Sequence, residues 1–422
     1  MDKSLIERDR AVIWHPYTQM KTALPVVPII RGEGAYLFDE DGKRYIDAVS
    51  SWWVTLHGHS HPYIAQKIAE QLTTLEHVIF AGFTHPVAIE LAEKLLQILP
   101  ADQSKVFYSD NGSTAVEVAL KMCLQYWSNQ GQTKTKIIAF KNSYHGDTFG
   151  AMAVSARSAF TEPFEKLLFE VEYIDTPNAE NISSLKSQIL GLQDVAAFIF
   201  EPLVQGSGGM LMYEAEYLDE LLLFCKENGI LTIADEVMTG FGRTGKLFAS
   251  DYLVNKADIF CLSKGLTGGT MALGVTTATG QIFDAFLSDD RLKTLFHGHS
   301  FTANPIACTA ALASLELTLK AETSDNMNRI KQSHNHFLER IKSHPKLKAV
   351  RQTGTIIAFE WNTGETTSYF SDLRDKLYTF FLDNGIILRP LGNIIYILPP
   401  FCISNDDLNY IYSKIEEALD KF

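Results

Sequence analysis

Long apolar runs, a cysteine framework and an excess of basic residues are all missing from this 422-residue sequence. No segment approaches the roughly 18 uninterrupted apolar residues of a membrane-spanning helix, and the charged opening from Met1 to Lys21 lacks the apolar core of a signal peptide. The five cysteines are odd in number and scattered, which favours reduced core thiols in a cytoplasmic protein over disulfides or a zinc site. The net charge of −13 argues against nucleic acid and anionic membranes as partners, while it permits local pockets for anionic small molecules.

The composition is that of a globular protein with a large core. Hydrophobic residues make up 46% and charged residues 21% of the chain, and its length predicts two domains. We expect an extended arm with a hairpin turned by Asp41-Gly42 between residues 35–38 and 44–46. The predicted division is an N-terminal arm and hairpin belonging to the small domain (1–60), a large domain (61–315) and a C-terminal small α/β domain (316–422).

Helical patterns alternate with short apolar strands in the large domain. Strands separated by helix-length segments predict crossover connections, and hence an α/β fold with a mostly parallel, seven-stranded sheet covered by helices on both faces. Strands are expected at residues 105–109, 136–140, 169–174, 195–200, 229–234, 258–263 and 274–279. Helices are expected through Val87, Leu91, Leu95 and Ile98, and through Val116, Leu120, Cys123 and Trp127. In the C-terminal domain we expect helices near 325–343, 369–385 and 404–421 and strands near 349–360 and 394–398.

Two of the predicted strands end in residues of complementary chemistry. One leads through Ile233 and Ala234 to Asp235, and the strand of residues 258–263 leads to Lys264. Because the ends of neighbouring parallel strands share one edge of a sheet, the carboxylate and the amine are expected to lie close together. A plain ion pair would explain such residues taken alone. The pair also suits an enzyme that uses pyridoxal phosphate, because the lysine can bond to the aldehyde while a buried aspartate keeps the pyridine nitrogen protonated.

Two further strand exits offer groups for an anionic, planar ligand. Gly112 and Ser113 stand where the strand of residues 105–109 meets the next helix. An anion fits the N–H groups at a helix N-terminus, although any helix could carry a simple cap there. Tyr144 follows the strand of residues 136–140, where its ring can either join the core or stack on a planar cofactor.

Five motifs occur in the order found in one enzyme family. They are Asn111-Gly112-Ser113, Tyr144-His145-Gly146, Asp235-Glu236-Val237 continuing to Gly245, Ser263-Lys264-Gly265, and His297-Gly298-His299-Ser300 continuing to Pro305. Over essentially its whole length the sequence therefore resembles the class III aminotransferases, which are pyridoxal phosphate enzymes of fold type I. The resemblance implies a transamination in two half-reactions, in which a donor amine leaves its amino group with the cofactor and a ketone then takes that group up.

The resemblance assigns roles position by position. Lys264 corresponds to the Schiff-base lysine that also acts as general base, and Asp235 to the partner of the pyridine nitrogen. Gly112 and Ser113 correspond to the phosphate cup. Tyr144 corresponds to the tyrosine that stacks on the cofactor ring and faces the substrate.

A later loop is implied to act across subunits. Gly298, His299 and Ser300 fall where this family reaches the cofactor phosphate from the neighbouring subunit, which implies a homodimer with shared active sites. His299 and Ser300 are expected to contact the cofactor and Gly298 the substrate. Ser300 stands where many members of the family have a threonine, and it keeps the hydroxyl group. Met238 stands where many members have a glutamine that contacts the cofactor, and because a thioether cannot replace that amide donor, ornithine- or aminobutyrate-type members fit less well.

Two N-terminal segments resemble one branch of the family, which transfers an amino group from S-adenosylmethionine to 8-amino-7-oxononanoate in biotin biosynthesis. The segments are Trp14-His15-Pro16-Tyr17-Thr18-Gln19 and Ser51-Trp52-Trp53. Trp52 and Trp53 could line an apolar trough and face a sulfonium cation, although adjacent tryptophans often belong to a core or an interface. Arg389 could clamp a substrate carboxylate or form a salt bridge at a strand end. Tyr17 is expected to act in catalysis by meeting the substrate amine.

Other polar residues near these motifs receive lesser roles. Arg243 is expected to be a structural charge near the site, and Glu201 a supporting residue. His57, His59 and His61 alternate as zinc ligands can, but no cysteine or carboxylate has ligand-like spacing. We therefore predict no metal site.

Three other activities stay open from the sequence. The chain could act on another ω-amine or use lysine as amino donor, it could be an aminomutase or decarboxylase on the same scaffold, or it could be a non-catalytic cofactor-binding sensor. Ping-pong kinetics would separate a transaminase from the second class. The presence of Lys264 and the lack of a DNA-binding appendage count against the third.

Overall fold

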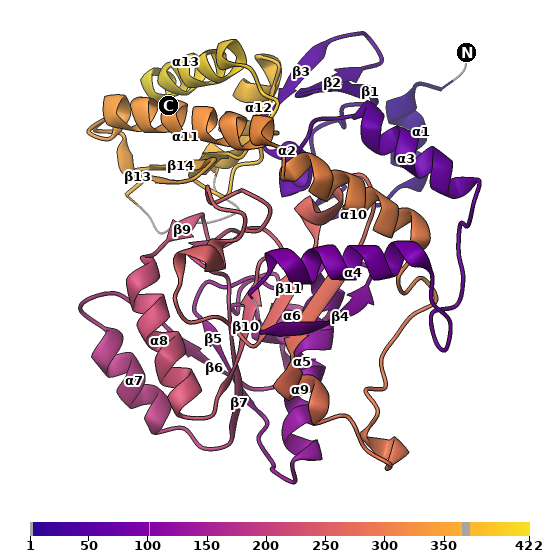
Figure 1. Ribbon diagram of the computed structural model, residues 1–422. Coiled ribbons are helices and arrows are strands. Elements are labelled where there is room, and N and C mark those ends of the chain that lie inside the picture. Colours follow the sequence, from indigo (N-terminus) through magenta and orange to yellow (C-terminus); the bar gives the residue numbers. More distant parts are fainter. Residues whose placement is uncertain (1–2, 101, 365–371) are drawn as a thin grey trace.

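The computed structural model describes residues 3–100, 102–364 and 372–422. Its largest sheet consists of β4 (Gln103–Ser109), β5 (Lys136–Phe140), β6 (Val171–Ile174), β7 (Val195–Phe200), β10 (Leu231–Asp235), β11 (Ile259–Leu262) and β12 (Gly274–Thr279). Their order across the sheet is β4-β12-β11-β10-β7-β5-β6 (Figure 1). β12 runs antiparallel to its two neighbours, β4 and β11, and the other four pairings in this sheet are parallel. The predicted mostly parallel, seven-stranded sheet is confirmed.

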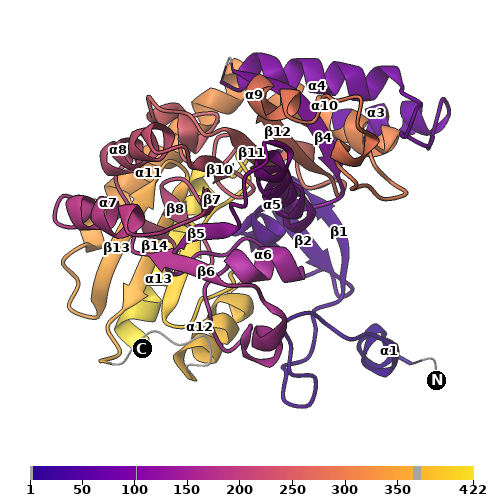
Figure 2. The ribbon, with the colours of Figure 1, turned by 90° about the horizontal axis from the view of Figure 1, so that it is seen from below.

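Both faces of this sheet are buried because its strands are almost entirely apolar. In β7, Phe198 and Phe200 enter one hydrophobic cluster, whereas Ala197 and Ile199 enter the cluster on the opposite face. The helices on one face are α5 (Gly112–Asn129), α6 (Phe149–Val154) and α9 (Gly280–Asp284), and those on the other are α4 (Pro86–Ile98), α7 (Ile182–Leu190) and α8 (Ala215–Glu227) (Figure 2). The two helices that apolar spacing predicted are α4 and α5.

The N-terminal arm contains a helix, so the prediction that it is wholly extended is wrong. α1 (Leu5–Val12) begins after Ser4, whose Oγ accepts a hydrogen bond from the N–H of Glu7, while the Glu7 carboxylate accepts one from the N–H of Ser4. None of its residues is buried. Because it packs no apolar face against a core, the helix leaves no amphipathic pattern in the sequence.

The predicted hairpin is present and links the arm to the C-terminal part of the chain. β1 (Ile29–Glu33), β2 (Tyr36–Asp39) and β3 (Arg44–Asp47) are antiparallel, and Gly42 turns the chain between the last two with a φ of 81°. β3 pairs in parallel with β15 (Ile386–Ile387). Segments from the two ends of the sequence therefore share one sheet.

The C-terminal part is built on an antiparallel sheet of β13 (Leu347–Thr353), β14 (Ile356–Trp361) and β16 (Ile394–Ile397). The prediction of a single strand at residues 349–360 is wrong, because the chain reverses at Gly354, which has a φ of 56°. α11 (Ala321–Ile341) packs against β13 and β14, and α13 (Asn405–Lys421) packs against α11 (Figure 1). The other helix here is α12 (Asp372–Asp383), and its predicted start at residue 369 lies outside the described residues.

The predicted domain boundary at residue 315 falls inside α10 (Pro305–Thr318). This helix contacts α3 (Pro62–Leu72) and α4 at one side and α11 at the other. The division into two domains stays a prediction. No helix in the described part of the chain is long and apolar enough to cross a membrane.

Candidate active site

The carboxyl ends of β10 and β11 bring Asp235 and Lys264 to one edge of the sheet. β10 ends at Asp235, which pairs with Cys261 of the parallel strand β11. Lys264 follows β11 after Ser263 and opens the 3₁₀ helix Lys264–Thr267 with a φ of 44°. A left-handed φ in a lysine is costly and persists only where the surrounding structure imposes it.

Burial also sets the protonation of Lys264. It lowers the pKa of the amine, an effect that the carboxylates of Asp235 and Glu201 oppose. A lysine with a lowered pKa is more often neutral, and the neutral amine is the form that attacks a carbonyl carbon or takes up a proton.

Asp235 is a buried carboxylate with two hydrogen-bond donors. It exposes 4% of its surface, its Oδ2 accepts a hydrogen bond from Nδ1 of His145 at 2.7 Å, and its Oδ1 accepts one from the N–H of Val237 at 3.1 Å. With Nδ1 donating to Asp235, Nε2 of His145 is buried and unpaired within the described chain. The sequence assigned no role to His145, because its partner lies 90 residues further along the chain.

The N-terminus of α5 lies against the end of β10. A Cβ atom at Gly112 would come within 2.7 Å of Val237, so glycine is required for this approach. Oγ of Ser113 accepts a hydrogen bond from the N–H of Asp147 at 3.2 Å, and a Cβ at Gly146 would lie 2.1 Å from that oxygen. Since the first N–H groups of a helix have no acceptor within the helix, this tightly framed end can hold an anion.

Glu201 fixes the segment that carries Tyr144. Its Oε1 accepts a hydrogen bond from the N–H of Tyr144 at 2.9 Å, and its Oε2 accepts one from the N–H of Gly206 at 3.0 Å. Burial raises the pKa of Glu201 to about 7, with His145 acting against the shift and Asp235 adding to it. Burial also raises the pKa of the Tyr144 hydroxyl, which lies 3.5 Å from the hydroxyl of Tyr17. Glu201 thus has the supporting position that the sequence suggested.

The two tryptophans extend outward from Lys264. Its Nζ lies 4.7 Å from the centroid of the Trp53 ring, and the guanidinium of Arg389 lies 4.2 Å from the Trp52 ring. Trp53 is buried, exposing 5% of its surface, and donates a hydrogen bond from Nε1 to the hydroxyl of Tyr396 at 3.0 Å. Trp52 is 38% exposed. One indole therefore faces the lysine and the other faces solvent beside a cation.

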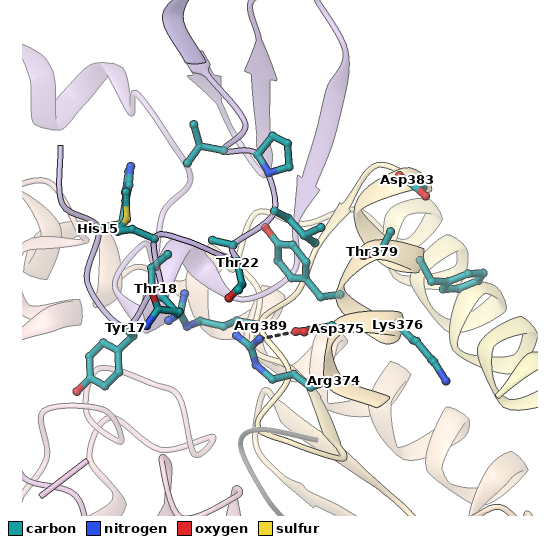
Figure 3. Close-up of a pocket in the computed structure, with 18 of the residues that line it drawn as sticks. His15, Tyr17, Thr18, Thr22, Arg374, Asp375, Lys376, Thr379, Asp383 and Arg389 are labelled. Atoms are coloured by element: carbon teal, nitrogen blue, oxygen red, sulfur yellow. Dashed lines mark hydrogen bonds and ion pairs between the residues drawn. The ribbon is translucent and has the colours of Figure 1, made fainter. Parts of the chain in front are cut away.

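Tyr17 continues this row into a cavity of about 1010 Å³ (Figure 3). Its ring packs edge-on against Trp52 with centroids 5.7 Å apart, and its hydroxyl donates a hydrogen bond to Asp147 at 2.6 Å. Arg389 lines the same cavity, whose walls come mainly from the N-terminal segment and α12. The structure therefore brings Tyr17, Trp52 and Arg389 together, and their role in binding substrate stays a prediction.

A family model described as aminotransferase class-III matches residues 17–419. The chain belongs to this family. It is 47% identical to the adenosylmethionine-8-amino-7-oxononanoate aminotransferase of Synechococcus elongatus over 97% of this chain and 98% of that protein. Among solved structures, the adenosylmethionine-8-amino-7-oxononanoate aminotransferase of Methanocaldococcus jannaschii has a TM-score of 0.95 at 38% identity, covering 99% of this chain and 98% of that one. An omega transaminase from Pseudomonas jessenii in complex with PMP has a TM-score of 0.93 at 28% identity, covering 99% and 98%.

Class III aminotransferases imply pyridoxal phosphate as cofactor, and the side chains present fit it. The buried carboxylate of Asp235 suits a protonated pyridine nitrogen. The end of α5 at Gly112 and Ser113, which added Cβ atoms would obstruct, suits a phosphate. Lys264 offers an amine at the same edge of the sheet.

The loop from Gly298 to Ser300 is not brought to this class III site within one chain. Among the described residues, its hydrogen bonds are local, between His299 and its sequence neighbours, and none joins it to the strand-end residues. Gly298 and Ser300 are exposed. Phe296 and Phe301 beside them expose 67% and 62% of their surfaces. Contact of this loop with a cofactor stays a prediction.

Met238, the departure from many class III members, packs near the indole that faces Lys264. A Cβ atom at Gly206 would lie 3.0 Å from Cε of Met238 and 3.2 Å from Trp53, so both side chains border the same glycine. The thioether therefore contributes apolar contact where a glutamine would offer an amide.

Arg243 and the histidine run have structural partners. Arg243 is fully buried, donates hydrogen bonds to the carbonyl oxygens of Pro399 at 2.8 Å and Thr55 at 3.4 Å, and has a pKa that burial lowers to about 9. Nε2 of His59 lies 2.9 Å from Oδ2 of Asp47. In the described ranges, no group of three or more histidine, cysteine or acidic side chains could hold a metal ion.

Proposed function

We propose that this class III aminotransferase transfers the amino group of S-adenosylmethionine to 8-amino-7-oxononanoate, forming 7,8-diaminononanoate in biotin biosynthesis. The observation that carries the proposal is the full-length similarity to proteins named for this pair of compounds. The row from Lys264 through Trp53 and Trp52 to Arg389 supports it. The acceptor is a long alkyl chain with a ketone near one end and a carboxylate at the other, so indole walls and a distant guanidinium suit it.

The side chains at the sheet edge divide the work of holding the cofactor and moving protons. Pyridoxal phosphate, when bound, supplies an electron sink that makes the Cα proton of an amino donor acidic. Asp235, oriented by His145, would keep the pyridine nitrogen protonated, and the N-terminus of α5 would hold the phosphate. Lys264 would remove the Cα proton as general base in the first half-reaction and return a proton in the second.

The outer side chains would bind both substrates in turn. Arg389 would clamp a carboxylate of the donor and then that of the acceptor, since a ping-pong enzyme uses one site twice. Trp52 would offer its π face to the sulfonium cation, a contact worth about 0.5–2 kcal/mol. The hydroxyls of Tyr17 and Tyr144 lie together where the substrate amine would enter.

We further infer a homodimer with shared active sites, located in the cytoplasm. The exposed loop from Gly298 to Ser300, with exposed Phe296 and Phe301 beside it, supports a subunit contact. The five cysteines are free and four of them are buried, which suits a reducing compartment.

Stopped-flow mixing of the cofactor-loaded enzyme with single amines tests the reaction and the donor. S-adenosylmethionine is expected to remove the absorbance of the lysine-bound cofactor, and 8-amino-7-oxononanoate is expected to restore it while mass spectrometry detects 7,8-diaminononanoate. A response to lysine but not to S-adenosylmethionine would show that the proposed donor is wrong, while the proposed transaminase activity would stand. A response only to simple ω-amines would favour the activity named for the omega transaminase neighbours.

A further inference from the structure

The two tryptophans stand on a turn with an unusual backbone. Ser50, Ser51 and Trp53 have φ angles of 50°, 60° and 68°, and Trp52 lies between them with a φ of −165°. The left-handed region brings Cβ against the following carbonyl oxygen, so residues with a side chain avoid it. Three such residues within one short turn are retained only where neighbouring contacts impose them, and such strain concentrates at functional sites.

The carboxylate of Asp47 holds this turn from the inside. Asp47 is fully buried, and its Oδ1 accepts hydrogen bonds from the N–H groups of Val49 at 3.3 Å and Ser51 at 2.9 Å. Its Oδ2 accepts one from Oγ of Ser51 at 2.9 Å and lies 2.9 Å from Nε2 of His59. Both donors of Ser51 therefore bond to one carboxylate.

Other contacts fix the two ends of the turn but not its middle. Oγ of Ser50 donates a hydrogen bond to the carbonyl of Leu398 at 2.7 Å, and Trp53 donates one to Tyr396 at 3.0 Å. Within the described residues, Asp47 is the only hydrogen-bond partner of the Ser51 side chain and N–H. Ser51 precedes Trp52, so its conformation directs that indole toward Arg389.

We propose that Asp47 is a positioning residue for substrate binding: by stabilising the left-handed turn it places Trp52 beside Arg389 and Trp53 beside Lys264. Asp47 acts through the turn, without touching the substrate itself. The identity of the substrates rests on the proposed function, whereas the placement of the indoles does not.

Kinetics of Asp47→Asn and Asp47→Ala test this role, with Asp39→Asn as matched control. Asp39 is another buried carboxylate of the same hairpin, exposing 7% of its surface, and it accepts hydrogen bonds from Tyr45 and Lys43, both at 2.8 Å. The Asp47 variants are expected to raise KM for both substrates about tenfold, with kcat changing less, because the strained turn loses its support. Asp39→Asn is expected to lower thermal stability and leave KM unchanged.

Near-ultraviolet circular dichroism of the cofactor-free protein gives a readout that needs no activity. The Asp47 variants are expected to lose the indole signal that is also lost in Trp52→Phe and Trp53→Phe, while Asp39→Asn keeps it. If the wild type used neither substrate, the proposed function would fail, yet this signal would still decide the role of Asp47. Asp47→Asn carries the test if Asp47→Ala does not fold.

Adding Ser51→Gly to Asp47→Ala tests whether backbone strain is the cause. Glycine adopts a positive φ without a steric cost. The double variant is therefore expected to have a KM part of the way back to the wild-type value and to recover part of the indole signal. The proposal is overturned if both Asp47 variants match the wild type, if Asp39→Asn changes KM and dichroism to the same extent, or if the added glycine restores neither.

Discussion

Lys264 differs from a lysine in water in two respects, since its backbone is left-handed and its amine has a pKa lowered by burial. Both follow from its place one residue beyond Ser263 at the end of β11, where the chain leaves the sheet beside Asp235. The fixed backbone aims the amine, and the lowered pKa keeps more of it unprotonated.

Lys264→Ala is expected to abolish turnover while the cofactor still binds noncovalently, because Asp235 and the N-terminus of α5 remain. Turnover, together with cofactor retained after gel filtration, measures the two effects separately. The exposed Lys246→Ala is the control and should behave as wild type. Appreciable turnover in Lys264→Ala would remove the assigned role.

Glu201 makes stability depend on pH in a definite direction. Burial raises its pKa from 4.5 to about 7, so the folded protein binds this proton more tightly than the unfolded chain does. The protonated carboxyl of Glu201 stabilises the folded state fully below about pH 4.5. This stabilisation of about 3 kcal/mol is lost as the pH rises through about 7. Glu201→Gln is expected to remove this decline, so the melting temperature of the wild type should fall relative to the variant between pH 5 and 8. A difference that is constant with pH would contradict this.

At the scale of the elements, the position of α5 against β10 depends on one small residue, Gly112. Gly112→Ala would place a methyl group 2.7 Å from Val237 and push the helix N-terminus away from β10. We expect the cofactor dissociation constant to rise about tenfold or more, because the anion loses aligned N–H groups. Gly280→Ala is the matched control, since Gly280 also opens a helix but an added Cβ would lie 3.5 Å from Ser104, an ordinary contact. Fluorescence titration of the apoenzyme compares the two, and equal affinities would contradict the steric argument.

The elements of the central sheet were predictable because their residues are buried on both faces. An apolar run such as Val195–Phe200 between polar turns is typical of a strand in a parallel sheet that helices cover on both sides. Its ends then indicate where functional groups gather, which is how Asp235 and Lys264 could be paired from the sequence. The resemblance to class III aminotransferases supplied the roles that spacing alone left open.

Other elements were missed where local pattern carries little information. α1 buries nothing and depends on one capping interaction, while β13 and β14 resemble a single strand in the sequence because only Gly354 and Thr355 separate them. The partners of Asp47 and His145 could not be inferred from spacing, because His59 and Asp235 reach them only in the folded chain.

On the scale of the whole molecule, the candidate site draws on nearly the full length of the chain. Tyr17 comes from the N-terminal segment, Lys264 from the central sheet and Arg389 from beyond β15, which pairs with β3. The site therefore forms only when the arm, the large sheet and the C-terminal part have assembled. The loop from Gly298 to Ser300, which was predicted to contact the cofactor, is not brought to this site within a single chain.

Subunit complementation tests whether that loop completes the site of a second chain. Ser300→Asp would set a negative charge against the cofactor phosphate and is expected to inactivate the enzyme, whereas Ser300→Thr keeps the hydroxyl and should remain active. Mixing Lys264→Ala with Ser300→Asp and allowing subunits to exchange is expected to restore activity, because one of the two sites in a hybrid dimer then contains both native residues. Since half of the dimers in an equal, randomly exchanged mixture are hybrids with one such site, activity should approach about a quarter of the wild-type value. No recovery, with exchange confirmed by mass spectrometry, would mean that each site is built within one chain.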